Sequence, residues 1–320
     1  MRVHAPPAGT AYHRITQRIP WWRTLLTLIA VLISTQVAVY PARLLRQHLP
    51  LDLPILGGFT PLIMSFLATA SILPVALLIV RWGEARRVGT LCSVTGRLRW
   101  PWLLLCTGIA VVCAGAAMLA IIAPTALAVA DGRLDLQVVL PILAVPDDLA
   151  ARLIIIGPIL LLPIIGQAAA EEFVTRGAVL QAVGRITRSP WPAIAVQAAV
   201  FTALHGSKVG FHPRTVQMLC FGLALGWITV RTGGIEAACA FHTAFNVLDV
   251  LAWDLLGMRT IVTGPWTRPV IIGTAIAVYV LIVRVVARGQ VLTTTPAATS
   301  AAPTTPATQR GEDETAGSPT

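Results

Sequence analysis

Charged side chains are scarce in this sequence of 320 residues. Only 12% of the residues are Asp, Glu, Lys or Arg, whereas 56% are hydrophobic. An average soluble domain carries about 25% charged residues, so this composition does not fit an ordinary soluble protein. Basic residues outnumber acidic ones, 24 to 14, for a net charge of +10. No basic stripe interleaved with aromatic residues is present, however, which argues against nucleic acid as a partner.

Cysteine pairs and zinc-binding signatures are also missing. The five cysteines form no C-x-x-C pair and are odd in number, which excludes a disulfide framework and a zinc finger. The H-E-x-x-H motif of many zinc proteases is absent as well. The first apolar run lacks a convincing A-x-A cleavage site, so we interpret it as a retained membrane span rather than a signal peptide.

Long apolar runs, by contrast, recur along the chain. A helix needs about 20 apolar residues to cross a bilayer, and tryptophans near the ends of several runs are typical of membrane interfaces. The eight candidate spans are 24–43, 58–80, 101–124, 153–175, 191–206, 214–230, 234–256 and 268–287. The sequence therefore predicts an all-α, polytopic membrane helix bundle of about eight transmembrane helices enclosing a polar cavity, within residues 21–288.

The distribution of arginine predicts the topology. Arginines concentrate in the N-terminus, in 81–100, in 176–190, at 231 and at 284–288. Cytoplasmic loops carry the excess of Arg and Lys, so we expect both termini to be cytoplasmic, in a multi-pass protein of the plasma membrane. Residues 1–20 are predicted to be a flexible cytoplasmic N-terminus. Residues 289–320 are too poor in large apolar residues to form a core and are predicted to be a disordered tail.

Ionisable and amide side chains gather in the second half of the chain, inside apolar runs. Such residues cost several kcal/mol in hydrocarbon unless they are paired or face a wet cavity, so they are candidates for function. On a helix, residues four apart share one face, which brings Glu172 near Arg176 and His242 near Asn246. The candidate site consists of Glu171, Glu172, Arg176, His205, His242 and Asn246.

These residue types support the activation of water. A carboxylate such as Glu171 can act as a general base, helped by the imidazole of His205, if the two lie within reach of one shared water. His242 and Asn246 can donate hydrogen bonds to the oxyanion of a tetrahedral intermediate. A metal site is the alternative: zinc would take Glu171, His205 and His242 as ligands.

Three short motifs occur in order along these helices. EEFVTR (171–176) resembles E-E-x-x-x-R, FTALH (201–205) resembles F-x-x-x-H, and HTAFN (242–246) resembles H-x-x-x-N. Together they resemble the CAAX protease and bacteriocin-processing (Abi, CPBP) family of intramembrane proteases. The resemblance covers about residues 150–255.

The resemblance implies roles for individual positions. Glu171 would activate water with His205, His242 and Asn246 would stabilise the oxyanion, and Glu172 with Arg176 would support the site. Members of this family have also been described as metalloproteases, so metal dependence with zinc stays an alternative to a mechanism that requires no cofactor.

The expected function is therefore that of an intramembrane endopeptidase acting on a membrane-associated peptide or protein within the lipid bilayer. The alternative is a non-proteolytic membrane protein on the same fold, either a proton-coupled transporter or a scaffold, because a proton relay would also need an intramembrane carboxylate.

Overall fold

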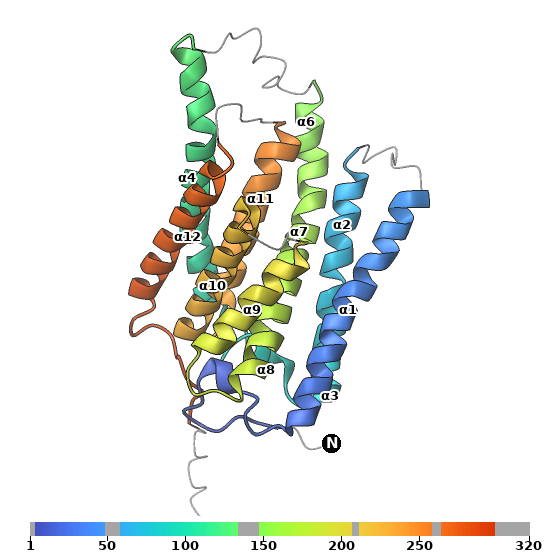
Figure 1. Cartoon of the computed structure of the whole chain (residues 1–320), viewed down its shortest axis with the longest axis vertical. Coiled ribbons are helices and arrows are strands. Elements are labelled where there is room, and N and C mark those ends of the chain that lie inside the picture. The colour runs from blue at the N-terminus through green and yellow to red at the C-terminus, as the bar shows by residue number, and fades with distance from the viewer. Residues whose placement is uncertain (1–3, 49–57, 134–146, 207–210, 258–263, 298–320) are drawn as a thin grey trace, which may run out of the picture.

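Long helices run side by side in the computed structural model of this chain (Figure 1). The structure describes residues 4–48, 58–133, 147–206, 211–257 and 264–297. Regular secondary structure in these ranges is helical, apart from three isolated β-bridges. The α-helices are α1 (Trp21–His48), α2 (Thr60–Ala70), α3 (Ile72–Gly83), α4 (Trp100–Ala130), α6 (Leu149–Ala151), α7 (Gly157–Glu172), α8 (Leu180–Gly184), α9 (Trp191–Leu204), α10 (Pro213–Thr232), α11 (Glu236–Val250) and α12 (Thr267–Val286).

Every predicted apolar run coincides with helix. Five stretches are long and apolar enough to cross a membrane, namely Trp21–Ala38, Thr60–Gly83, Trp100–Ala130, Leu149–Gly184 and Thr267–Val286, and α9 is a shorter apolar helix. Large apolar side chains point outward from these helices, for example Leu162 with 76% and Val112 with 71% of its surface exposed. Such a surface suits lipid rather than water. The chain is therefore a multi-pass membrane protein, and the predicted helix bundle is confirmed.

The fourth span is longer than the sequence predicted. We expected it to end near residue 175, with Arg176 in a basic loop. Instead, the helix continues through a π-helical turn, Phe173–Val179, into α8. The Arg176 side chain is 0% exposed, because its guanidinium pairs with Glu172 inside the bundle. Glu171 consequently lies within the length of the membrane helix and not at its end.

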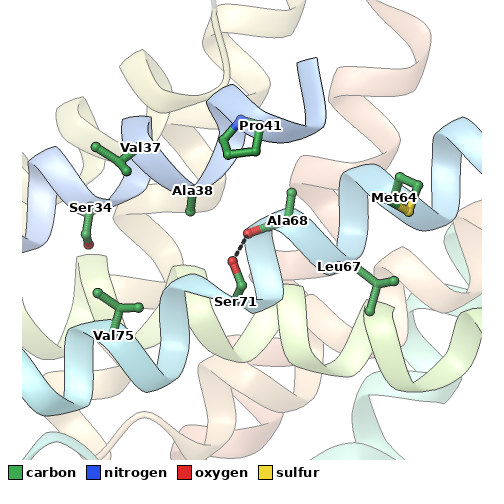
Figure 2. Close-up of a pocket in the computed structure, with 9 residues that line it drawn as sticks. All are labelled: Ser34, Val37, Ala38, Pro41, Met64, Leu67, Ala68, Ser71 and Val75. Atoms are coloured by element: carbon green, nitrogen blue, oxygen red, sulfur yellow. Dashed lines mark hydrogen bonds between the residues drawn. The ribbon is translucent and has the colours of Figure 1, made fainter. Parts of the chain in front are cut away.

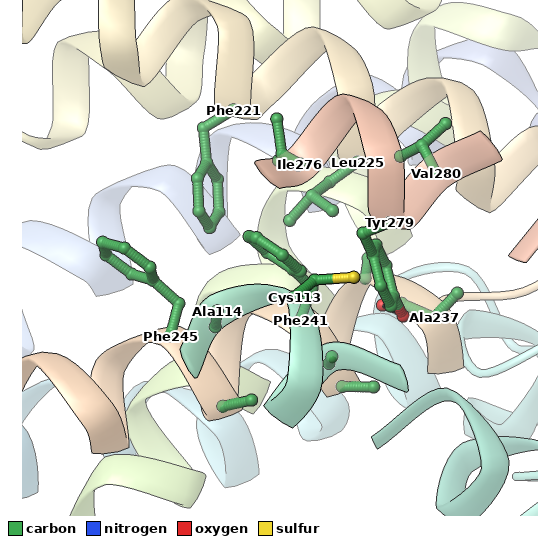
Figure 3. Close-up of a cluster of buried hydrophobic side chains, with 14 of the residues drawn as sticks. Cys113, Ala114, Phe221, Leu225, Ala237, Phe241, Phe245, Ile276, Tyr279 and Val280 are labelled. Carbon is green, nitrogen blue, oxygen red and sulfur yellow. Dashed lines mark hydrogen bonds between the residues drawn. The ribbon is translucent and has the colours of Figure 1, made fainter. Parts of the chain in front are cut away.

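A large apolar core holds the second half of the bundle together. Phe221 of α10, Phe241 and Phe245 of α11, and Tyr279 of α12 meet there against α4 (Figure 3). The Tyr279 hydroxyl donates a hydrogen bond of 2.7 Å to the carbonyl of Ala237, which satisfies its polar group within the apolar surroundings. This core packs α10, α11 and α12 against α4, and it thereby positions α11, which carries His242 and Asn246.

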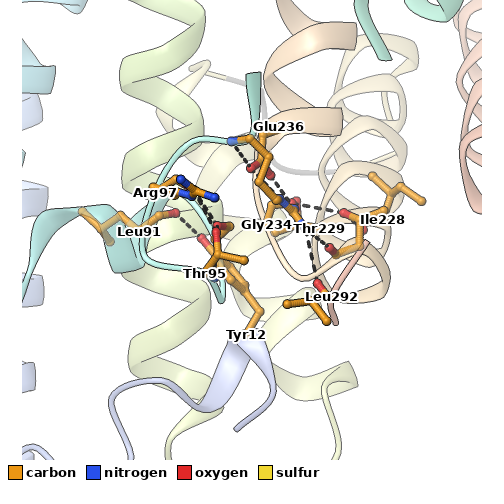
Figure 4. A network of polar contacts seen from close by, with 12 residues as sticks. Tyr12, Leu91, Thr95, Arg97, Ile228, Thr229, Gly234, Glu236 and Leu292 are labelled. Carbon is orange, nitrogen blue, oxygen red and sulfur yellow. Dashed lines mark hydrogen bonds and ion pairs between the residues drawn. The ribbon is translucent and has the colours of Figure 1, made fainter. Parts of the chain in front are cut away.

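A polar network closes one end of the bundle (Figure 4). Arg99, just before α4, donates to both carboxylate oxygens of Glu236 at 2.8 and 2.7 Å. The same guanidinium donates to the carbonyls of Thr232 and Leu292. Glu236 is fully buried. The network therefore joins α4, α10 and α11 to the segment that follows α12.

The described parts of both terminal segments make contacts at that same end of the bundle (Figure 1). Tyr12 is 0% exposed and donates a hydrogen bond to the carbonyl of Leu91. The Thr10 amide donates to the Thr295 hydroxyl at 2.9 Å. These contacts differ from the expected loose N-terminus and from the expected disorder starting at residue 289. Buried hydrogen bonds between distant segments account for the difference. The expected tail beyond residue 297 lies outside the described residues.

Candidate active site

Three helices bring the predicted catalytic side chains together. Glu171 lies near the end of α7, His205 caps the C-terminus of α9, and His242 lies in the first half of α11. The Glu171 Oε2 atom is 3.4 Å from His205 Nε2 and 3.7 Å from His242 Nε2. The E-E-x-x-x-R, F-x-x-x-H and H-x-x-x-N motifs, which are far apart in the sequence, therefore meet at the Oε2 atom of Glu171.

Hydrogen bonds on the far side of each imidazole fix the orientation of both rings. His205 Nδ1 is 2.8 Å from the carbonyl oxygen of Phe201, and His242 Nδ1 is 2.8 Å from Glu172 Oε1. A carbonyl and an ionised carboxylate only accept hydrogen bonds, so both Nδ1 atoms carry hydrogen. Both Nε2 atoms are thereby directed toward Glu171.

The predicted pair of Glu172 and Arg176 forms deep inside the bundle. Arg176 NH1 donates to Glu172 Oε1 at 3.0 Å, and both side chains are 0% exposed. The guanidinium carbon of Arg176 lies 4.3 Å from the centre of the Phe201 ring. That ring also contacts the imidazoles of His205 and His242, with centroids 4.3 and 5.9 Å apart. Phe201 therefore packs against the arginine and against both imidazoles.

Gln167, which the sequence analysis overlooked, links two of the predicted residues. Its amide nitrogen donates to Glu171 Oε1 at 2.6 Å, and its carbonyl oxygen accepts a hydrogen bond of 2.8 Å from Asn246. Asn246 thus reaches Glu171 through Gln167 and not directly. Gln167 lies four residues before Glu171 on α7, and this i,i+4 spacing is the signal that identifies it.

A cavity opens beside Glu171 and His205. It has a volume of about 110 Å³, and its lining includes Thr35 and Gln36 of α1 and Thr69 of α2. A single buried water needs about 10 to 15 Å³ of such space, so the cavity has room for several waters. Glu171 Oε2 is buried and has no hydrogen-bond partner among the described residues. The free carboxylate oxygen therefore lies where a water can reach it.

The ionised side chains of the site do not balance. Glu171 and Glu172 bring two negative charges, and Arg176 brings one positive charge. One negative charge is left over in a low-dielectric setting, where an unpaired charge is costly. A positive charge beside the two carboxylates would balance it, and the His242 imidazole lies next to both, with Nδ1 2.8 Å from Glu172 Oε1 and Nε2 3.7 Å from Glu171 Oε2.

A metal ion would supply the same positive charge. Glu171, His205 and His242 have the donor types that zinc prefers. In the part of the chain that the structure describes, however, no group of three His, Cys, Asp or Glu side chains is arranged to hold a metal ion. The chemistry proposed below uses the side chains of the chain alone.

Comparison with known proteins assigns this region to a family. Residues 154–248 match the family model described as type II CAAX prenyl endopeptidase Rce1-like. The chain carries an Rce1-like domain. This domain contains Gln167 and all six predicted site residues, and its limits agree with the resemblance expected for about residues 150–255. Helices α1 to α4 and α12 lie outside it.

A curated bacterial relative is similar to part of this chain. The uncharacterised protein YyaK of Bacillus subtilis (strain 168) is 33% identical over 93 residues, which cover 28% of this chain and 30% of YyaK. The chain therefore matches less than a third of that relative's length. No solved structure matches the chain.

Proposed function

We propose that this protein is an intramembrane endopeptidase that hydrolyses a peptide bond of a membrane-associated peptide or protein. The observation that carries the proposal is the convergence of His205 Nε2 on the free Glu171 Oε2 atom, 3.4 Å apart, beside a cavity with room for water. A base must reach its proton directly or through one water, and this spacing meets that requirement. The family match supports the same reaction class.

The proposed chemistry begins with a water between Glu171 and His205. As the water oxygen attacks the substrate carbonyl, Glu171 Oε2 takes one of its protons, and the neutral His205 Nε2 accepts a hydrogen bond from the other. The tetrahedral intermediate then collapses. The carbon–nitrogen bond breaks while Glu171 returns its proton to the leaving amine, so that one water and one peptide bond become a carboxyl and an amino group.

The remaining site residues stabilise charge and hold the base. A protonated His242, whose Nδ1 hydrogen is bound by Glu172, presents its Nε2 hydrogen to the developing oxyanion. The buried Arg176 balances Glu172. Asn246 acts differently from the direct oxyanion donor expected from sequence, since its amide holds Gln167, which in turn orients Glu171.

The arginine-rich end of the bundle faces the cytoplasm of the plasma membrane in this proposal. Arg23, Arg99 and Arg185 make hydrogen bonds at the end where the two terminal segments meet, and the excess of arginine marks the cytoplasmic side. A protease-accessible tag at either terminus tests this. Both tags are expected to be digested only from the cytoplasmic side.

The test of function compares cells that produce the wild type with cells that produce Glu171→Gln. Quantitative mass spectrometry of new peptide termini in the membrane fraction is expected to show cleavage products only in the wild type. Asp148→Asn is the matched control, because it makes the same carboxylate-to-amide change in an exposed ion pair with Arg152. Identical termini in all three strains would disprove proteolysis.

A further inference from the structure

A glutamine side chain is exposed in the middle of α1, where the helix crosses the membrane. Gln36 lies about 22 Å along the axis from Trp21, well within a hydrocarbon core of about 30 Å. Among the described residues, the Gln36 amide nitrogen donates a hydrogen bond of 3.3 Å to the Thr35 hydroxyl. An amide with open donor and acceptor positions costs free energy against lipid tails. Its neighbourhood must therefore supply polar partners.

The space beside Gln36 is a groove between α1 and α9. The groove has a volume of about 650 Å³, and it is lined by Leu32 and Gln36 of α1 and, at the α9 side, by Val200, Ala203, Leu204, His205 and Gly206. This volume is in the range of sites that take a ligand or a short peptide segment. The groove is therefore large enough for a stretch of polypeptide.

The groove is continuous with the candidate active site. Gln36, Leu204 and His205 line both the groove and the 110 Å³ cavity beside Glu171. A chain lying in the groove along α9 would reach His205 and then Glu171. Gln36 lies at the junction of the two spaces, and it belongs to a helix outside the Rce1-like domain of residues 154–248.

A second groove, between α1 and the segment of α2 and α3, has a different lining (Figure 2). It has a volume of about 480 Å³ and a mostly apolar lining. Its hydroxyl groups are satisfied within their own helices, since Ser34 donates to the carbonyl of Val31 and Ser71 to that of Ala68, each at 2.7 Å. Gln36 lies about 160° around the helix from Ser34. The two sides of α1 therefore differ in chemistry.

We propose that the groove between α1 and α9 binds the extended backbone of the substrate next to the cleaved bond, with the Gln36 carboxamide hydrogen-bonded to it. A carboxamide presents one acceptor and two donor hydrogens, which complement the N–H and C=O groups of a peptide. A lipid tail offers neither. The inference rests on the proposed endopeptidase function, and it assigns to α1 the part of the substrate site that the Rce1-like domain does not supply.

The first test measures occupancy without catalysis. Full-length Glu171→Gln protein carrying either Gln36→Cys or Ser34→Cys is reconstituted in phosphatidylcholine vesicles. A water-soluble methanethiosulfonate reagent is added, and labelling at each of the two positions is quantified by mass spectrometry. The competitor is a pool of synthetic peptides with one apolar membrane segment and a randomised flanking segment. We expect labelling at position 36 to be at least about tenfold faster than labelling at position 34, because the groove is wet, and the pool to slow it at least about threefold.

Two results would overturn the inference. Absence of labelling at position 36 would mean that Gln36 faces lipid, and labelling that the peptide pool does not slow would mean that the groove holds only water.

The second test uses the active protein and the same peptide pool. Gln36→Leu keeps the side-chain size and removes the amide, so kcat/KM is expected to fall about tenfold, mainly through KM, because binding in the ground state is lost. Ser34→Leu, on the opposite face of α1, is expected to leave kcat/KM unchanged. Equal cleavage by Gln36→Leu and wild type would refute the role of Gln36 while proteolysis stands. Protection of position 36 without any cleavage by the wild type would instead refute the proteolytic function.

Discussion

Among the buried clusters of charged residues that the structure describes, those around Glu236 and around Glu171 differ in how completely their polar atoms are paired. Glu236 and Arg99 match one carboxylate with one guanidinium, and both carboxylate oxygens accept hydrogen bonds. The cluster around Glu171 has two carboxylates for one guanidinium. Among the described residues, four of its polar atoms have no partner, namely Glu171 Oε2, Glu172 Oε2, Arg176 Nε and Arg176 NH2.

The difference separates a stabilising contact from a reactive one. Buried polar groups are nearly always hydrogen-bonded, so an unpaired buried atom requires an explanation such as a catalytic role or a bound water. In the pair of Arg99 and Glu236, both carboxylate oxygens are occupied by the guanidinium. The Glu171 cluster leaves two carboxylate oxygens without a partner among the described residues, and one of them, Glu171 Oε2, belongs to a residue that lines a cavity. We therefore expect substitutions in the two clusters to affect different properties.

The largest expected effect is on catalysis at Glu171. Glu171→Gln removes the proposed general base while retaining size and hydrogen bonding, so kcat is expected to fall by about 10² to 10⁴. Cleavage of a native substrate in reconstituted vesicles measures the change, and circular dichroism checks that the helices remain. If Glu171→Gln retains more than about a tenth of the wild-type activity, Glu171 is not the general base.

The next effect is on stability at Glu236. Glu236→Gln leaves the guanidinium of Arg99 without a charged partner in a site where Glu236 is fully buried, and breaking a buried pair costs about 3 to 5 kcal/mol. The thermal unfolding midpoint in detergent is expected to fall by several degrees, whereas kcat per folded molecule stays at the wild-type value. If Glu236→Gln keeps wild-type stability but loses activity, Glu236 is needed for catalysis and does not act mainly in stability.

Gln167 is expected to have a smaller effect on catalysis. Gln167→Leu removes the amide that orients Glu171, so kcat is expected to fall about tenfold to a hundredfold with little change in KM. Gln197 is the matched control, since its amide is also buried but bonds to the carbonyls of Ile194 and Gly222. Gln197→Leu should lower stability and leave kcat unchanged. Equal kinetic effects of the two variants would assign Gln167 a purely structural role.

The smallest expected effect is that of chelators. In the proposed mechanism, water activation by Glu171 and His205 uses no metal ion, so dialysis against a strong zinc chelator should change kcat by less than about twofold. Elemental analysis of the purified protein should be done on the same sample. If activity is lost and zinc restores it, a metal ion takes part in the reaction and the proposed metal-free mechanism is wrong.

Much of the fold follows from the sequence because hydropathy and helical periodicity are local properties. Each apolar run became helix, and the i,i+4 spacing of Glu172 and Arg176 correctly indicated their contact. The three motifs indicated which helices meet, and the structure places Glu171, His205 and His242 together. Their catalytic roles stay a proposal for the tests above.

Other features have no local signal in the sequence. No residue type marks the π-helical turn of Phe173–Val179, so the fourth helix was predicted to end too early. The contact of Tyr12 with Leu91 joins residues 79 positions apart and depends on how the whole bundle closes. Gln167 was overlooked because an uncharged amide in an apolar run does not stand out, although its spacing from Glu171 repeats the spacing that identified the other pair.

The ring of Phe201 has a consequence for where the positive charge of the site resides. Its centre lies 4.3 Å from the guanidinium carbon of Arg176 and 4.3 Å from the centre of the His205 ring. The face of an aromatic ring attracts a cation, which compensates the two nitrogen atoms of Arg176 that lack hydrogen bonds among the described residues. The ring thereby helps to hold the permanent cation beside Glu172, and it packs against the imidazole of His205 at the same time.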